Sequence, residues 1–200
     1  VGFKPTYGRC SRYGTIAMKS STDSPGPITK TVDDAALILS LVSGHDPLDA
    51  TSINEGPWQI PPPLSSLKKI KIGLPLSYFP KEIQPDVKKA ILNSSEIFKK
   101  LGAEIVELPD MLDPKYSVAV YTILQRSEVS SNLNRFDGIR YGHDRSYFSL
   151  EAKRRIMLGT YSLSAGYYDA YYGQAQKVRT LIKRDFEQVF EQVDAIATPV

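Results

Sequence analysis

Three consecutive cations, Lys153, Arg154 and Arg155, stand immediately before the apolar run 156–158. Successive residues of an α-helix are turned by about 100°, so these side chains point in different directions around a helix. If that helix is packed on both sides, at least one cation is forced toward the interior, where it needs an anionic partner. The alternative, a solvated run of charges, agrees equally well with the periodicity. Residues 153–155 are therefore the first candidates for an anion-binding site.

The residue types used by the common hydrolases are scarce in this sequence. Only His45 and His143 could serve as imidazole bases or metal ligands, and no H-E-x-x-H pattern is present. Ser164 lacks the first glycine of a G-x-S-x-G elbow and follows an expected helix. Cys10 is the single cysteine, which excludes an intrachain disulfide, fits a reducing compartment and is typical of an inert thiol. Spacing alone thus indicates no catalytic set.

Residues 1–30 are dense in glycine and proline, which favours sharp turns over regular structure. A phosphate-binding loop is one hypothesis, but neither GxxxxGKS/T nor GxGxxG occurs. Residues 15–18 are expected to form a short strand. Cations and tyrosines are interleaved in this region: Lys4, Tyr7, Arg9, Arg12, Tyr13 and Lys19.

Composition bounds the class of protein. Apolar residues make up 42% of the 200 residues and charged residues 24%, as in an ordinary globular domain. The formal net charge of +3 is too small to indicate nucleic-acid binding by itself. No apolar run approaches the ~20 residues of a membrane span. Because the chain starts at Val1 without a methionine and stops at Val200, we expect a fragment.

Alternating helical and strand patterns predict an α/β fold with a mixed β-sheet core flanked by helices. Thr31 is an expected helix N-cap, followed by two acidic residues, and Gly44 ends that helix. The strand–helix–strand unit over 70–108 is typical of parallel pairing with a right-handed crossover. The expected helices span 32–42, 85–101, 117–133 and 168–192; the expected strands span 70–75, 104–108 and 194–199; and residues 45–67 are expected to form a surface loop.

The longest expected helix, 168–192, would be about 37 Å long at 1.5 Å per residue. Apolar residues recur in it at steps of three and four, while most of its charges are turned away from that stripe. A stripe of this length needs a broad partner surface. Its members are Tyr171, Ala175, Val178, Ile182, Phe186, Val189 and Val193.

Four segments of the sequence carry a family resemblance: 1–23, 26–52, 130–142 (SSNLNRFDGIRYG) and 152–182 (AKRRIMLGTYSLSAGYYDAYYGQAQKVRTLI). Residues 1–23 are similar to the tail of the amidase signature, and residues 26–52 continue as that family does. The other two segments are more specific, and together the four resemble the A subunits of the glutamyl-tRNA(Gln)/aspartyl-tRNA(Asn) amidotransferases. The resemblance implies that residues 1–200 are a partial single amidase domain. That domain would lack its N-terminal catalytic part and its C-terminal end.

The resemblance implies a glutaminase. Members of the family hydrolyse the glutamine side-chain amide with a Lys–Ser–Ser triad, and backbone N–H groups stabilise the oxyanion. The triad would precede Val1, so no catalytic residue is expected in this chain. Ammonia would pass to the B subunit, which uses ATP and Mg to amidate charged tRNA; the B and C subunits would be the partners. A cytoplasmic or organellar location without a membrane span is expected.

Two residues match positions that bind glutamine in the family. Arg155 matches the arginine that pairs with the α-carboxylate, and a two-pronged guanidinium suits that role better than lysine. Tyr121 matches a tyrosine that contacts the same substrate. The alternatives are a structural salt bridge for Arg155 and a core aromatic for Tyr121. The acidic partner of the substrate ammonium would lie beyond Val200.

Two departures from the family pattern are present. Ser24-Pro25 replaces the usual Gln-Ile, and the segment 143–151 is shorter than in the family, which could alter the substrate entrance or the contact with the B subunit. Two other functions stay open. One is a stand-alone amidase of the same superfamily, and the other is an inactive truncated product that only binds the B and C subunits. Arg155 favours the amidotransferase, because a general amidase has no fixed carboxylate to hold.

Overall fold

The computed structural model describes residues 1–109 and 111–199. These residues form two compact units that each combine two stretches of chain, and the units are described separately below. The prediction of a partial single domain concerns the whole protein and stays a prediction. The first unit consists of Val1–Pro62 and Gln125–Ser162, and the second of Pro63–Leu124 and Leu163–Val200.

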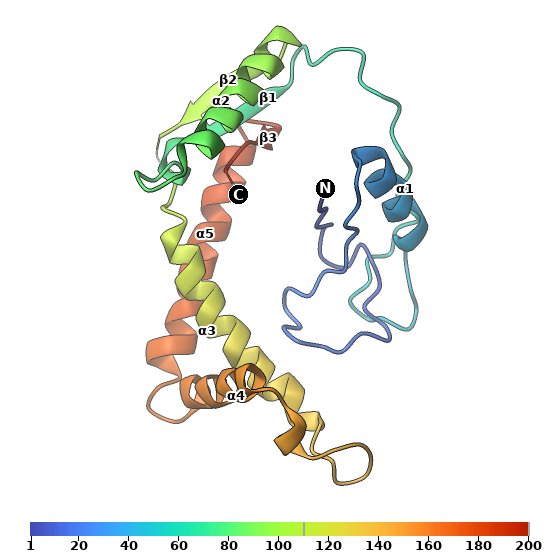
Figure 1. Ribbon diagram of the computed structural model, residues 1–200, viewed down its shortest axis with the longest axis vertical. Helices are drawn as coiled ribbons and strands as arrows, with labels where there is room; N and C mark the ends of the chain where they lie inside the picture. Colours follow the sequence, from blue (N-terminus) through green and yellow to red (C-terminus); the bar gives the residue numbers. More distant parts are fainter. Residues whose placement is uncertain (110, 200) are drawn as a thin grey trace. The chain divides into compact units, whose positions relative to one another are not determined.

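The second unit contains a three-stranded sheet in the order β2-β1-β3 (Figure 1). Helix α2 connects β1 to β2, and the two strands are parallel with Gly73 opposite Val106, as predicted. Strand β3 is also parallel to β1, with Ile72 opposite Ala195. The elements are β1 Lys71–Pro75, the 3-10 turn Leu76–Tyr78, α2 Pro85–Lys100, β2 Glu104–Leu108 and β3 Ala195–Ile196.

The α/β class is confirmed, but the described sheet is purely parallel instead of mixed. Long crossovers return the chain in the same direction on both sides of β1, and such connections favour parallel pairing. The apolar spacing of the helix predicted over 85–101 places Val87, Ala90, Ile91, Ile97 and Phe98 on its buried face. In α2, however, Ala90 and Ile97 are exposed, Ile97 at 55%, whereas Ser95 is buried.

Helix α5, Gln174–Phe190, follows a short π-helical stretch, Asp169–Gly173. The two together confirm the predicted long helix, although its first turns are wider than α-helical ones. The predicted stripe is buried or half-buried except at Tyr171, which is 41% exposed. Against the sheet the core consists of Leu108, Met111, Val189 and Val193. A second cluster joins α5 to the first half of α3, which lies beside it in Figure 1, and contains Val120, Leu124 and Ala175.

In the first unit, helix α1 spans Val32–Val42, as predicted. The Thr31 hydroxyl accepts a hydrogen bond from the Asp34 N–H at 3.1 Å, which caps the first turn. The apolar spacing predicts a buried face of Val32, Ala35, Ala36, Leu39 and Val42. Of these only Ala35 and Leu39 are buried, and Val32 is 68% exposed.

The strand expected over 15–18 is wrong. The Thr15 N–H donates to the Arg12 carbonyl in a turn, and the Met18 N–H donates to the Asp23 carboxylate. Because a turn and a side chain satisfy these groups, no neighbouring strand is needed.

Two helices cross closely in the first unit: the second half of α3, Lys115–Asn132, and α4, Leu150–Leu163. A Cβ atom added to Gly159 of α4 would lie 1.9 Å from the Arg126 carbonyl oxygen of α3. Beside this point the buried hydroxyls of Ser127 and Ser162 are 2.7 Å apart. Glycine and serine thus let the two backbones approach. Two 3-10 turns, Leu133–Arg135 and Arg145–Tyr147, lie in the connection between α3 and α4.

Candidate functional site

Arg155 lies on α4, one helical turn after Glu151. Its Nε donates to Glu151 Oε1 at 2.8 Å, and Arg154 Nη1 reaches Glu151 Oε2 at 3.3 Å. The Arg154 side chain is 61% exposed and that of Arg155 only 34%. Lys153 Nζ donates to the Ser146 carbonyl at 2.8 Å. Of the two arginines, Arg155 is therefore the one turned inward.

The ion pair with Glu151 is the structural salt bridge that the sequence left open as an alternative. The hydrogen bond from Arg155 lowers the pKa of the Glu151 carboxyl, so the pair is charged near neutral pH. The pair occupies only Nε of Arg155. Its Nη1 and Nη2 have no hydrogen-bond partner among the residues that the structure describes. These two nitrogens form the fork that accepts a carboxylate with two parallel hydrogen bonds.

Tyr121 lies in the first half of α3, on the opposite side from the buried core. Its neighbours Val120 and Leu124 pack toward α5, whereas the Tyr121 side chain is 55% exposed. Tyr121 is thus not a core aromatic of its unit. Tyr121 and Arg155 belong to different units, and the role of each in binding glutamine stays a prediction.

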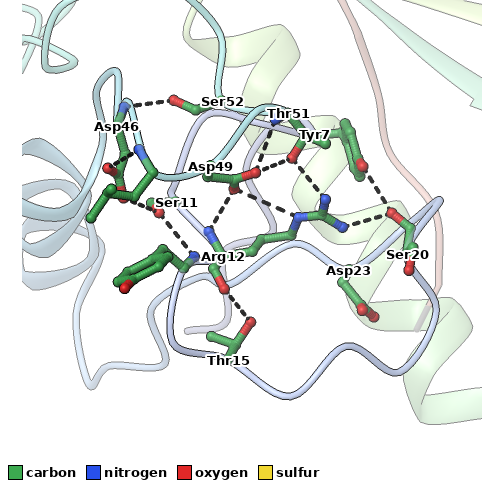
Figure 2. Close-up of polar contacts among 12 residues, drawn as sticks. Tyr7, Ser11, Arg12, Thr15, Ser20, Asp23, Asp46, Asp49, Thr51 and Ser52 are labelled. Atoms are coloured by element: carbon green, nitrogen blue, oxygen red, sulfur yellow. Dashed lines mark hydrogen bonds and ion pairs between the residues drawn. The ribbon is translucent and has the colours of Figure 1, made fainter. Parts of the chain in front are cut away.

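Arg12 and Asp49 are the centre of a polar network that sequence patterns missed (Figure 2). Arg12 donates through Nη1 to the Ser20 carbonyl at 2.7 Å and through Nη2 to the Thr51 hydroxyl at 2.7 Å. The Arg12 backbone N–H donates to Asp49 Oδ2 at 2.8 Å, and its guanidinium lies 5.0 Å from the centre of the Tyr7 ring. The interleaved cations and tyrosines were a signal for this network, but its partners come from 37 and 39 residues further along the chain.

The Asp49 carboxylate is held in its charged form by several donors. Hydrogen bonds from the Thr51 hydroxyl and from the Arg12 and Thr51 backbone N–H groups lower its pKa to about 2. A cavity of about 280 Å³ adjoins the pair and is lined by residues of both loops, among them Arg12, Tyr13, Asp23, Leu48 and Asp49.

We expect Asp49→Asn to make the protein less sensitive to acid. A carboxyl with pKa about 2 when folded and about 3.9 when unfolded stabilises the fold above about pH 4. That contribution is lost as the pH falls from about 4 to about 2. Urea midpoints between pH 6 and pH 2.5 should therefore fall less steeply in the variant than in the unchanged protein. The exposed Glu82→Gln serves as the control, and identical profiles for Asp49→Asn and the unchanged protein would contradict the assignment.

The loop 18–23 is fixed by side chains of α3. Both the backbone N–H and the hydroxyl of Ser21 donate to the Glu128 carboxylate, at 2.9 and 2.6 Å. Asn132 Nδ2 donates to the Met18 carbonyl at 3.1 Å. Asp23 accepts the Met18 N–H inside the loop. These bonds hold the loop in one conformation beside the Arg12 network.

The remaining chemical candidates add no reactive group. Burial raises the pKa of the Cys10 thiol, which keeps it protonated and unreactive. In the part of the chain that the structure describes, no group of three or more His, Cys, Asp or Glu side chains could hold a metal ion. None of the described helices has the length and apolarity needed to cross a membrane.

The sequence profile of the family described as Amidase matches residues 1–200. The chain belongs to the amidase family. Among curated proteins, the A subunit of glutamyl-tRNA(Gln) amidotransferase from Geobacter sulfurreducens is 48% identical over 221 residues, which cover 100% of this chain and 44% of the relative. The A subunit from Fusobacterium nucleatum is 49% identical over 216 residues. The chain thus spans less than half the length of these relatives.

Solved structures of amidases have the same fold. The crystal structure of the A subunit of glutamyl-tRNA(Gln) amidotransferase from Thermotoga maritima matches with a TM-score of 0.74 and 35% identity, over 98% of this chain and 43% of that one. A bacterial aryl acylamidase of the amidase signature family matches with a TM-score of 0.69 and 24% identity, over 99% and 42%. At that identity the likeness shows the fold alone. The resemblance inferred from residues 1–23, 26–52, 130–142 and 152–182 is confirmed at the level of the family.

Proposed function

We propose that the full-length protein is the glutaminase subunit of a tRNA-dependent amidotransferase. It hydrolyses the side-chain amide of glutamine and supplies ammonia that converts glutamate on tRNA(Gln) to glutamine, or aspartate on tRNA(Asn) to asparagine. The observation that carries this proposal is the 48% identity to the A subunit of glutamyl-tRNA(Gln) amidotransferase over all of this chain. The aryl acylamidase, at 24%, is far more distant.

In this proposal the chain binds substrate and does not itself contain the reacting groups. The free Nη1 and Nη2 of Arg155 hold the α-carboxylate of glutamine, while Glu151 fixes the guanidinium through Nε. Such a fork places the side-chain amide at a fixed distance from the carboxylate, which orients it for attack. Tyr121 contacts the same substrate, and the Lys–Ser–Ser triad lies upstream of residue 1.

Partners and location follow from the same proposal. The B subunit receives the ammonia and uses ATP and Mg²⁺ to activate the carboxyl group on the charged tRNA. The C subunit completes the complex. The site of action is the cytoplasm or an organellar matrix.

Co-expression of the full-length protein with the B and C subunits should yield a stable complex that releases glutamate from glutamine. Interfaces of this kind bury at least about 1,200–2,000 Å², so the complex should survive size-exclusion chromatography. The measurements are glutamate release and the elution volume. An active monomer that ignores glutamine and hydrolyses aryl amides would instead support a stand-alone amidase.

A further inference from the structure

The positive charge of this chain is concentrated in one stretch, residues 135–155, which we call the basic segment. It holds six cations and three carboxylates, a formal net charge of +3, which equals that of all 200 residues. The rest of the chain is therefore neutral overall, and the net positive charge of the protein lies in this segment. The cations are Arg135, Arg140, Arg145, Lys153, Arg154 and Arg155.

Most of these cations are not neutralised by a carboxylate. Arg135 Nε donates to the Asn132 carbonyl at 3.0 Å, and Lys153 Nζ to the Ser146 carbonyl. Arg145 likewise bonds the neutral Asn134. Exposed Arg140 has no hydrogen-bond or ion-pair partner among residues 1–109 and 111–199. Within these same ranges only Arg154 and Arg155 of the six form an ion pair, which leaves four cations available to an external anion.

Aromatic rings stand exposed among these charges. Tyr141 is 90% exposed and Tyr147 is 71% exposed. The His143 ring stacks on one face of Tyr147, with centroids 3.8 Å apart and planes at 11°. A flat ring with a free face is a platform on which an unpaired base stacks.

The basic segment has a defined backbone that presents these groups. Gly138 has φ +73°, and a Cβ atom there would lie 2.5 Å from the Asp144 nitrogen, so the loop closes tightly at its base. Asp137 Oδ1 accepts the Ile139 N–H at 2.9 Å, and Asp144 Oδ1 accepts the Ser146 N–H at 2.7 Å. Residues 135–143 surround a hollow of about 650 Å³. Binding to a preorganised surface loses less conformational entropy than binding to a flexible one.

We propose that the basic segment binds unpaired RNA. Arg135, Arg140 and Arg145 contact successive phosphates, and Tyr141 stacks on a base; the Tyr147–His143 pair offers a second platform. Cations alone would suit any polyanion, including an acidic protein. The exposed rings beside them favour a nucleic acid with free bases, because stacking requires a flat partner. The phosphate contacts assigned to Arg135, Arg140 and Arg145 do not use the fork of Arg155, which lies at the end of the same segment, and RNA binding goes beyond the proposed glutaminase function.

The test uses the full-length protein in complex with the B and C subunits. The probe is a 5′-fluorescein-labelled 12-nucleotide oligo(A) RNA, and its anisotropy is followed from about 50 to about 200 mM salt. Tyr141→Ala should weaken binding about 5- to 150-fold, which is the affinity generally lost when one base–aromatic stacking contact is removed. Arg140→Gln should reduce the slope of log K against log salt by about 0.7, the value of one phosphate contact with a single strand. The matched controls are Tyr13→Ala, also an exposed tyrosine, and Lys183→Gln, also an exposed cation; both should bind as the unchanged complex does.

Three results would overturn the proposal. The first is equal binding by Tyr141→Ala and Tyr13→Ala, because no base would then stack on this segment. The second is an unchanged salt slope in Arg140→Gln. The third concerns a poly-glutamate peptide used as a second probe. If Arg140→Gln weakened binding of this peptide but left RNA binding unchanged, the ligand of the segment would be an acidic protein. Glutamine hydrolysis, measured on the same preparations, tests the proposed function independently.

Discussion

Arg155→Lys in the full-length protein is expected to lower kcat/KM for glutamine about 10- to 150-fold. Lysine keeps the charge but loses the fork, and one hydrogen bond to a charged group is worth about 1.5–3 kcal/mol. Amidation that uses free ammonia should be unchanged, because ammonia bypasses the glutamine site. Glutamate release and ammonia-dependent formation of the amidated tRNA are the two measurements.

Two control variants separate substrate binding from a structural role. Arg154→Lys alters the neighbouring, more exposed arginine, and it should change kcat/KM little. Glu151→Gln removes the ion pair but leaves the Nη fork in place. Because exposed ion pairs contribute only about 0–1 kcal/mol, Glu151→Gln should retain most activity. Equal loss of glutamine- and ammonia-dependent activity in Arg155→Lys would show that Arg155 acts only on the structure.

Gly159→Ala is expected to destabilise the protein by about 1–2 kcal/mol net. The added Cβ would lie 1.9 Å from the Arg126 carbonyl oxygen, so α3 and α4 must move apart. Overpacking costs about 1–3 kcal/mol and occasionally more, and this contact is with backbone that cannot rotate away. The gain of about 1 kcal/mol in helix propensity offsets only part of that cost. Urea unfolding of the full-length protein measures the difference.

Gly56→Ala is the matched control. Gly56 belongs to the same unit, and a Cβ atom there would meet no heavy atom within 4 Å. That variant should stay within about 0.5 kcal/mol of the unchanged protein, as surface substitutions generally do. If Gly159→Ala proved equally mild, the close crossing of α3 and α4 would be wrong.

Elements fixed by local chemistry could be predicted from the sequence. Helix α1 was located to the residue, because the Thr31 cap and Gly44 act on their own neighbours. Strand β2 was also placed to the residue, since a short run of apolar and acidic residues is bounded by Gly102 and Pro109. The long stripe of α5 was predicted from its regular apolar spacing. Its π-helical start was not, because an extra residue in a turn leaves little mark on that spacing.

Features that join distant residues could not be predicted. The Arg12–Asp49 network depends on two irregular loops meeting, and neither loop has a period that shows where it goes. The failed strand over 15–18 has the same origin, since Asp23 satisfies the backbone that a strand would have offered. Of the candidate site, the spacing left open whether one of the three cations turns inward or all are solvated, and the family resemblance selected Arg155. Only the structure shows that Glu151 holds Arg155 through Nε.

The sheet order β2-β1-β3 has a consequence for folding during synthesis. Ile72 pairs with Ile105, 33 residues later, but with Ala195 only 123 residues later. At about 5–20 residues per second, β2 follows β1 from the ribosome after about 2–7 s, and β3 after about 6–25 s. For the interval between, β1 has one open edge, which is a template for pairing with another chain. Of the three described strands, β1 and β2 are thus the first pair that can form, and the other edge of β1 stays unpaired with β3 while α3, α4 and α5 are being made.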